Sequence, residues 1–316
     1  MEAIVGNSPV RPGPIAVRLF GTFEIQRSGD VLSAADLGGC KPRHILEILL
    51  LNLGSPVSKA HIVETVWGPG HGAGTVAALE SYICGIRRMI QPGNTKGGPL
   101  RTVNGGYVLD PALVDLDLFR FRRMVESAAR VRPEDAYELL TEALAMSAEP
   151  LLSGELGADW ADVARAGLAT ERLAVQVKAA ETAGLLERPL DAIHWATMAI
   201  TSDPLHERAW TLLVTAYESC GLVAEGLAAY ARCRSAFDRE LGCAPGPALQ
   251  AAYLRLLRQR AEDDADLAEV MAALVYLGDS LNAAAEASRG CPKAGLAREE
   301  AGRIVASFLR KAQVAV

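Results

Sequence analysis

Apolar residues in the first 110 positions recur with two different periods. Two short segments alternate apolar and polar residues around Gly21, which predicts antiparallel strands. Longer segments carry apolar residues every three or four positions, which predicts helices. These helices are expected at residues 41–53, 59–67 and 75–90. Pro42 suits the first turn of the first helix, and Ser58 suits the N-cap of the second.

The third predicted helix has two distinct faces. Its inward face is expected to hold Val76, Leu79, Ile83, Ile86 and Ile90. At about 100° per residue, the opposite face holds Ala77, Ala78, Ser81, Cys84, Gly85 and Arg88, with Tyr82 and Arg87 on the flanks. A helix with such an outward face is suited to the major groove of DNA.

A short hairpin is expected after the third helix, at residues 101–109, with Asn104 in its tip. A recognition helix followed by such a wing is typical of a DNA-binding domain. Paired arginines at the end of a helix are by themselves weak evidence, because cations are favoured there by the helix dipole. The order of strands, helices and hairpin is the stronger indication.

The segments KPRHILEILLLNLG, VSKAHIVETVWG, LESYICGIRRMI and GGYVLD together resemble the OmpR-type winged helix of the Streptomyces antibiotic regulatory protein (SARP) family of transcriptional activators. The family usually has Asn where Ala77 stands, Ser near Cys84 and a polar or basic residue near Gly85. The expected reading face is therefore bare. Gly85 also costs about 1 kcal/mol relative to Ala in a helix interior.

The predicted DNA-binding residues come from this helix, the helix before it and the wing. They are Lys59, Thr75, Ala77, Ser81, Cys84, Gly85, Arg87, Arg88, Arg101 and Asn104. Because the reading face is bare, we expect weaker direct base readout. More of the affinity is then expected from phosphate contacts by the basic residues and from the wing.

From Val114 onward the chain is rich in Ala, Leu, Glu and Arg with helical spacing, and no further strand is expected. An internal repeat places Ala192, Ala196 and Ala199 34 positions before Gly226, Tyr230 and Cys233. This period is that of tetratricopeptide repeats. A plain helical bundle is the alternative, since only two units align.

The segments DPLHERAW and GLVAEGLAAYARCRSAFDRELGCAPGPAL resemble the bacterial transcriptional activator domain of SARP proteins. The predicted fold is an α+β N-terminal winged helix-turn-helix followed by an all-α tetratricopeptide-like domain. The expected division is a flexible N-terminus at 1–13, the winged helix at 14–112, the activator domain at 113–260 and a helical appendage of unknown role at 261–316.

Charge supports this division. The net charge is -6, but residues 1–110 hold ten Lys and Arg against eight Asp and Glu, whereas the remainder is acidic. Only the N-terminal third is therefore suited to phosphate. Six scattered cysteines without a metal-ligand spacing favour free thiols in the cytoplasm and no metal site. The longest apolar stretch, Ile45 to Leu53, is too short to span a bilayer, so no membrane partner is expected, and no cofactor is expected either.

Several rival functions are disfavoured. Glycines 68, 70, 72 and 74 precede a helix, but no Lys follows where a phosphate-binding loop requires it. The histidines have no nucleophile arranged beside them in a recognised motif, so an enzyme is not expected.

The resemblance implies an activator bound side by side with a second copy on direct repeats of promoter DNA near the -35 region. It would recruit RNA polymerase through the sigma factor and the alpha and beta subunits, and localise with the nucleoid. Two alternatives are an interaction protein with weakened DNA binding and a small-ligand sensor using the concave repeat surface.

Overall fold

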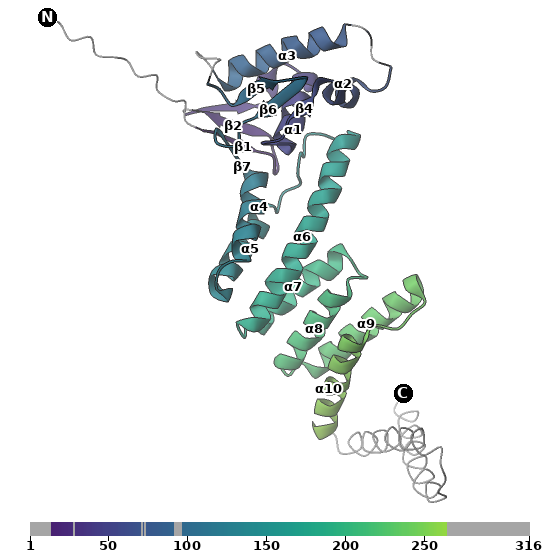
Figure 1. Cartoon of the computed structure of the whole chain (residues 1–316). Coiled ribbons are helices and arrows are strands. Elements are labelled where there is room, and N and C mark those ends of the chain that lie inside the picture. The colour runs from purple at the N-terminus through teal and green to yellow at the C-terminus, as the bar shows by residue number, and fades with distance from the viewer. Residues whose placement is uncertain (1–13, 28, 71, 73, 92–96, 264–316) are drawn as a thin grey trace, which may run out of the picture. The chain divides into compact units, whose positions relative to one another are not determined.

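The computed structural model describes residues 14–27, 29–70, 72, 74–91 and 97–263 (Figure 1). The predictions for residues 1–13 and 264–316 lie outside the described residues. The chain divides into two compact units, Met1–Lys178 and Ala179–Val316. Each unit is described by itself.

A mixed four-stranded sheet opens the first unit. Its strands are β1 (Ile15–Arg18), β2 (Glu24–Arg27), β3 (Asp30–Ser33) and β7 (Val114–Leu116), in the order β3-β2-β1-β7. Alternation buries Ile15, Val17 and Ile25 on one face. Strand β7 is parallel to β1, with Ile15 opposite Val114. The expectation that no strand follows Val114 is therefore wrong: this three-residue strand is completed by a partner about 100 positions away.

The three predicted helices and the wing are present. The helices are α1 (Cys40–Leu51), α2 (Lys59–Trp67) and α3 (Thr75–Ile90), preceded by a short 3-10 helix, η1 (Ala34–Leu37). Ser58 caps α2 as predicted, because its hydroxyl accepts a hydrogen bond from the His61 amide at 3.1 Å. The wing is formed by β5 (Leu100–Val103) and β6 (Gly106–Leu109), and β6 also pairs with β4 (Val57–Ser58).

The core of the winged helix lies between the inward faces of α1 and α3. From α1 it includes the buried residues Ile45, Leu46, Leu49 and Leu50. From α3 it includes Leu79, Ile83, Ile86 and Ile90, as predicted. Each such side chain contributes about 1.5 to 3 kcal/mol through burial. The placement of Val76 on this face is wrong: it lies in the first turn of α3 and is 45 % exposed.

Helices α4 (Asp117–Ala128) and α5 (Pro133–Met146) belong to the same unit, as does most of α6 (Asp159–Leu185). The buried carboxylate of Asp117 accepts hydrogen bonds from the amides of Leu19 and Phe20 at 2.8 and 2.9 Å. The Leu152 amide, in the loop after α5, donates to the Leu19 carbonyl at 2.8 Å. Hydrogen bonds thus attach α4 and the loop after α5 to the segment that follows β1.

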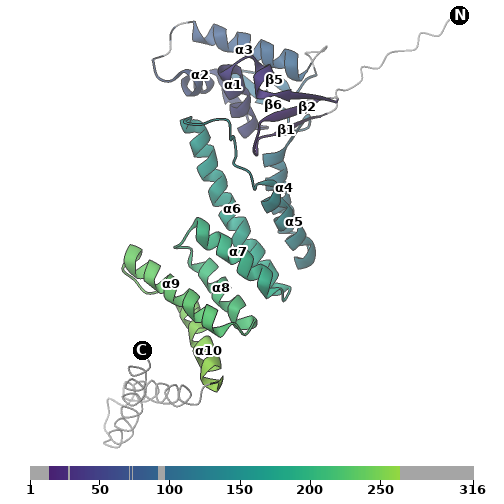
Figure 2. The same ribbon diagram turned by 180° about the vertical axis from the view of Figure 1, so that it is seen from behind.

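The described part of the second unit contains the end of α6 and α7 (Pro189–Ser202), α8 (Glu207–Ser219), α9 (Val223–Leu241) and α10 (Pro247–Asp263). Helix α9 begins 34 positions after α7, which is the predicted repeat. A β-carbon at Gly226 would collide with the side chain of Leu256, so this glycine lets α9 approach α10 closely. The predicted fold class, a winged helix followed by a tetratricopeptide-like helical domain, is confirmed (Figure 2).

Candidate nucleic-acid interface

Helix α3 lies on the side of the winged helix away from α4 and α5 in both views (Figures 1 and 2). The predicted reading face is accessible, because Ala77, Ser81, Cys84 and Arg88 are exposed and Gly85 is half-buried. A β-carbon at Gly85 would meet nothing within 4 Å. The face is therefore open and carries only small side chains before Arg88, and its contact with DNA stays a prediction.

Arg87 is engaged by the wing. Its Nε donates to the Leu100 carbonyl at 3.1 Å, and its Nη2 donates to the Thr102 hydroxyl at 2.6 Å. Its guanidinium also lies 5.9 Å from the centre of the Tyr107 ring. These contacts fix the end of α3 to the hairpin, so Arg87 positions the two predicted DNA-binding elements relative to each other.

Lys59, the first residue of α2, contacts both α3 and the wing. Its Nζ lies 2.5 Å from Glu80 Oε1 and 5.8 Å from the centre of the Tyr107 ring. Its amide donates to the Gly105 carbonyl at 2.9 Å. The pKa of Lys59 is raised, mainly by its hydrogen bond to Glu80. Tyr107 therefore has a cation from each of two helices beside its ring.

The remaining predicted cations differ in their partners. Arg101 on β5 pairs with Asp110 at 2.8 Å and keeps 58 % of its side chain exposed. Arg88 is exposed, and no ion pair or hydrogen bond of its side chain is found within the described residues. Arg88 is thus the predicted phosphate ligand with the least competition from the protein itself.

The wing tip is a tight turn at Asn104 and Gly105, since Val103 and Gly106 are opposite each other in the hairpin. Gly105 has a φ of 76°, in the region that favours glycine. Asn104 is exposed at this tip. Its side chain is therefore free to reach a groove or a phosphate.

Thr75, the first residue of α3, is 7 % exposed. Its hydroxyl donates to the Gly72 carbonyl at 2.6 Å, so the structure shows it holding the start of the helix. Sequence reasoning missed the partners of the basic residues, namely Glu80, Thr102, Tyr107 and Asp110. Glu80 lies on α3, whereas its partner Lys59 lies on α2, so no local pattern points to this pair.

Two family models match the chain. Residues 40–109 match the transcriptional regulatory protein C-terminal domain, and residues 116–257 match the bacterial transcriptional activator domain. The regulatory protein DnrI of Streptomyces peucetius is 28 % identical over 244 residues, covering 74 % of this chain and 89 % of DnrI. The chain belongs to the SARP family.

Other SARP-like relatives agree with this assignment. AfsR of Streptomyces coelicolor is 30 % identical over 83 % of this chain, which spans only 26 % of AfsR. RedD of the same organism is 29 % identical, with 79 % of this chain and 75 % of RedD covered. The structure of Mycobacterium tuberculosis EmbR in complex with a low-affinity phosphopeptide shares the fold, with a TM-score of 0.68 at 24 % identity, covering 82 % of this chain and 70 % of EmbR. This SARP chain is a DNA-binding transcriptional activator.

A buried polar cluster connects the winged helix of this SARP chain to the segment before α6. Glu155 is 3 % exposed; its carboxylate forms an ion pair with Arg43 and lies 2.6 Å from Nε2 of His44, both on α1. Glu47, also on α1, is 2 % exposed. Burial, followed by the negative charge of Glu155, raises the pKa of Glu47 to about 8. Trp160 packs edge-on against His44.

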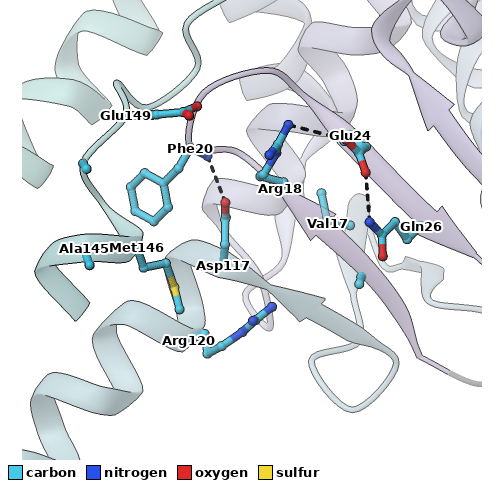
Figure 3. Close-up of a pocket in the computed structure, with 12 residues that line it drawn as sticks. Val17, Arg18, Phe20, Glu24, Gln26, Asp117, Arg120, Ala145, Met146 and Glu149 are labelled. Atoms are coloured by element: carbon cyan, nitrogen blue, oxygen red, sulfur yellow. Dashed lines mark hydrogen bonds and ion pairs between the residues drawn. The ribbon is translucent and has the colours of Figure 1, made fainter. Parts of the chain in front are cut away.

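A cavity of about 450 Å³ opens between β1, β2, α4 and the end of α5 in this SARP chain (Figure 3). Phe20 and Met146 give it an apolar side, and the Arg18 side chain, paired with Glu24 at 3.4 Å, gives it a polar side. The ligand-sensor alternative placed its site on the repeat surface, whereas this cavity belongs to the first unit.

Within the described residues, no three His, Cys, Asp or Glu side chains are grouped closely enough to hold a metal ion. Among the described helices, none has the length and apolar content needed to cross a membrane.

Proposed function

We propose that this SARP chain activates a secondary-metabolite, and specifically antibiotic, biosynthesis cluster. In this proposal the winged helix binds direct repeats near the -35 region, with a second copy side by side. The activator domain then recruits RNA polymerase through the sigma factor and the alpha and beta subunits. The chain would act in the cytoplasm at the nucleoid and would catalyse no reaction.

One observation carries the proposal: an exposed α3 face lies beside a wing, in a chain whose remainder matches the bacterial transcriptional activator domain. Two cations support the proposal, because exposed Arg88 lies at the end of the reading face and Arg101 lies on the wing strand β5. Phosphate contacts set register and affinity, whereas sequence is read at base edges. Small side chains on α3 leave room for a close approach to those edges.

The test is selection of bound sequences from a randomised duplex pool by the full-length protein, followed by a salt titration on the enriched sequences. We expect enrichment of direct repeats spaced by about one helical turn. Log affinity should fall steeply with log salt, by about 0.9 for each phosphate contacted. Addition of polymerase holoenzyme to the winning duplex then tests recruitment.

Arg88→Ala supplies the matched variant. It should weaken binding on all duplexes and reduce the salt slope by about 0.9, as expected for one lost phosphate contact. Arg123→Ala removes an exposed arginine from α4 and is the control. Equal losses in the two variants would show that Arg88 acts only through net charge.

The bare face of α3 supports a second candidate, an interaction protein that acts through its helical domain with weakened DNA binding. Ala77, Ser81 and Gly85 supply no side chain able to make a bidentate contact with a base. This candidate predicts no enriched sequence and a shallow salt dependence. Clear enrichment of repeats would exclude it.

A further inference from the structure

One acidic side chain stands among the predicted DNA-binding residues. Glu80 is the acidic residue of α3, and its carboxylate lies 2.5 Å from Lys59 Nζ, with 53 % of the Glu80 side chain and 31 % of the Lys59 side chain exposed. The pair is therefore accessible to solvent and to any polyanion that approaches α3.

Glu80 stands at the edge of the reading face. It is three positions after Ala77 and four before Cys84, so all three are neighbours on the helix surface. Seven positions further along, Arg87 is held by the wing. The carboxylate is therefore on the flank of α3 that faces α2 and the wing.

A phosphate and a carboxylate compete for the same ammonium group. DNA affinity depends on how many phosphates the protein neutralises, and each adds about 0.9 to the slope of log affinity against log salt. A lysine paired with its own carboxylate releases fewer counterions from DNA.

We propose that Glu80 sets the DNA affinity of this winged helix by acting as an internal counter-ion that competes with the DNA backbone for Lys59. The proposal rests on the DNA-binding function proposed above. In this proposal, Lys59 contacts the DNA backbone only after its ion pair with Glu80 breaks. Glu80 itself contacts no base.

The experiment measures salt titrations of the full chain on one enriched duplex and one unrelated duplex. Glu80→Gln should tighten binding to both duplexes and steepen the salt slope by about 0.9. With this change in slope, the gain in affinity over wild type should be about three- to fourfold larger at 50 mM than at 200 mM salt. This gain in affinity should disappear in the Lys59→Gln background, so the double variant Lys59→Gln with Glu80→Gln should bind DNA no more tightly than Lys59→Gln alone.

Glu64→Gln is the matched control, because it removes an exposed carboxylate from the neighbouring helix α2. Equal tightening by Glu64→Gln would overturn the proposal in favour of a general charge effect. A Glu80→Gln effect confined to one base pair of the enriched duplex would overturn it in favour of base reading. An unchanged salt slope would also overturn it. Enrichment of direct repeats by the wild-type protein tests the proposed function separately. Failure of that function can therefore be distinguished from failure of the Glu80 proposal.

Discussion

Titration of Glu47 is expected to make the stability of the first unit depend on pH. Burial is the main reason that its pKa is raised from 4.5 to about 8, and the charge of Glu155 raises it further while Arg43 lowers it. Near neutral pH, Glu47 is therefore protonated in the folded protein, whereas the same group is ionised in the unfolded chain.

The direction in which stability changes with pH follows from proton binding. A carboxyl group with a higher pKa in the folded state holds its proton more tightly there, so unfolding releases the proton and stability falls as pH rises. The fall begins at 4.5 and is complete above a pH of about 8. Each pKa unit corresponds to about 1.4 kcal/mol, so the free energy of unfolding should fall by about 3 kcal/mol up to neutral pH and by about 5 kcal/mol over the whole window.

Glu47→Gln tests this reasoning, because the amide has nearly the same shape and does not titrate. We expect the variant to gain stability over wild type as pH rises, with little gain near pH 5 and about 3 kcal/mol at neutral pH. Urea denaturation followed by circular dichroism between pH 5 and 8 gives the two curves. Glu64→Gln is the exposed control. A constant difference between Glu47→Gln and wild type across this range would refute the reasoning.

Two further predictions concern the stability of the fold. Arg87→Lys keeps the charge but cannot make both bonds to the wing, so it should lower the free energy of unfolding by about 1 to 2 kcal/mol; unchanged stability with weaker DNA binding would instead make Arg87 a phosphate ligand. Gly167→Ala, in an open position on α6, should raise stability by about 1 kcal/mol in thermal unfolding. Gly226→Ala should show no such gain, since its β-carbon would meet the Leu256 side chain; equal gains would show that α9 has room to spare.

Local patterns predicted much of the winged helix. The period of α3 identified Leu79, Ile83, Ile86 and Ile90 as buried and left Ser81 and Cys84 exposed. Amphipathic period depends only on the helix itself, which is why this prediction held. It failed at Val76 because periodicity gives the direction of a side chain but not where its neighbouring elements end.

The sequence by itself determined the order of the first three helices and the wing, the two domain types and the outward face of α3, because these follow from local period, capping and turn chemistry. Strand β7 was missed, because its three residues are completed by β1 about 100 positions away. Only the tertiary structure decided what the charged residues do. Arg87 meets the wing, Lys59 meets Glu80, and Glu155 meets α1 across more than 100 positions. Such pairs depend on how separate elements pack, and no local pattern contains that information.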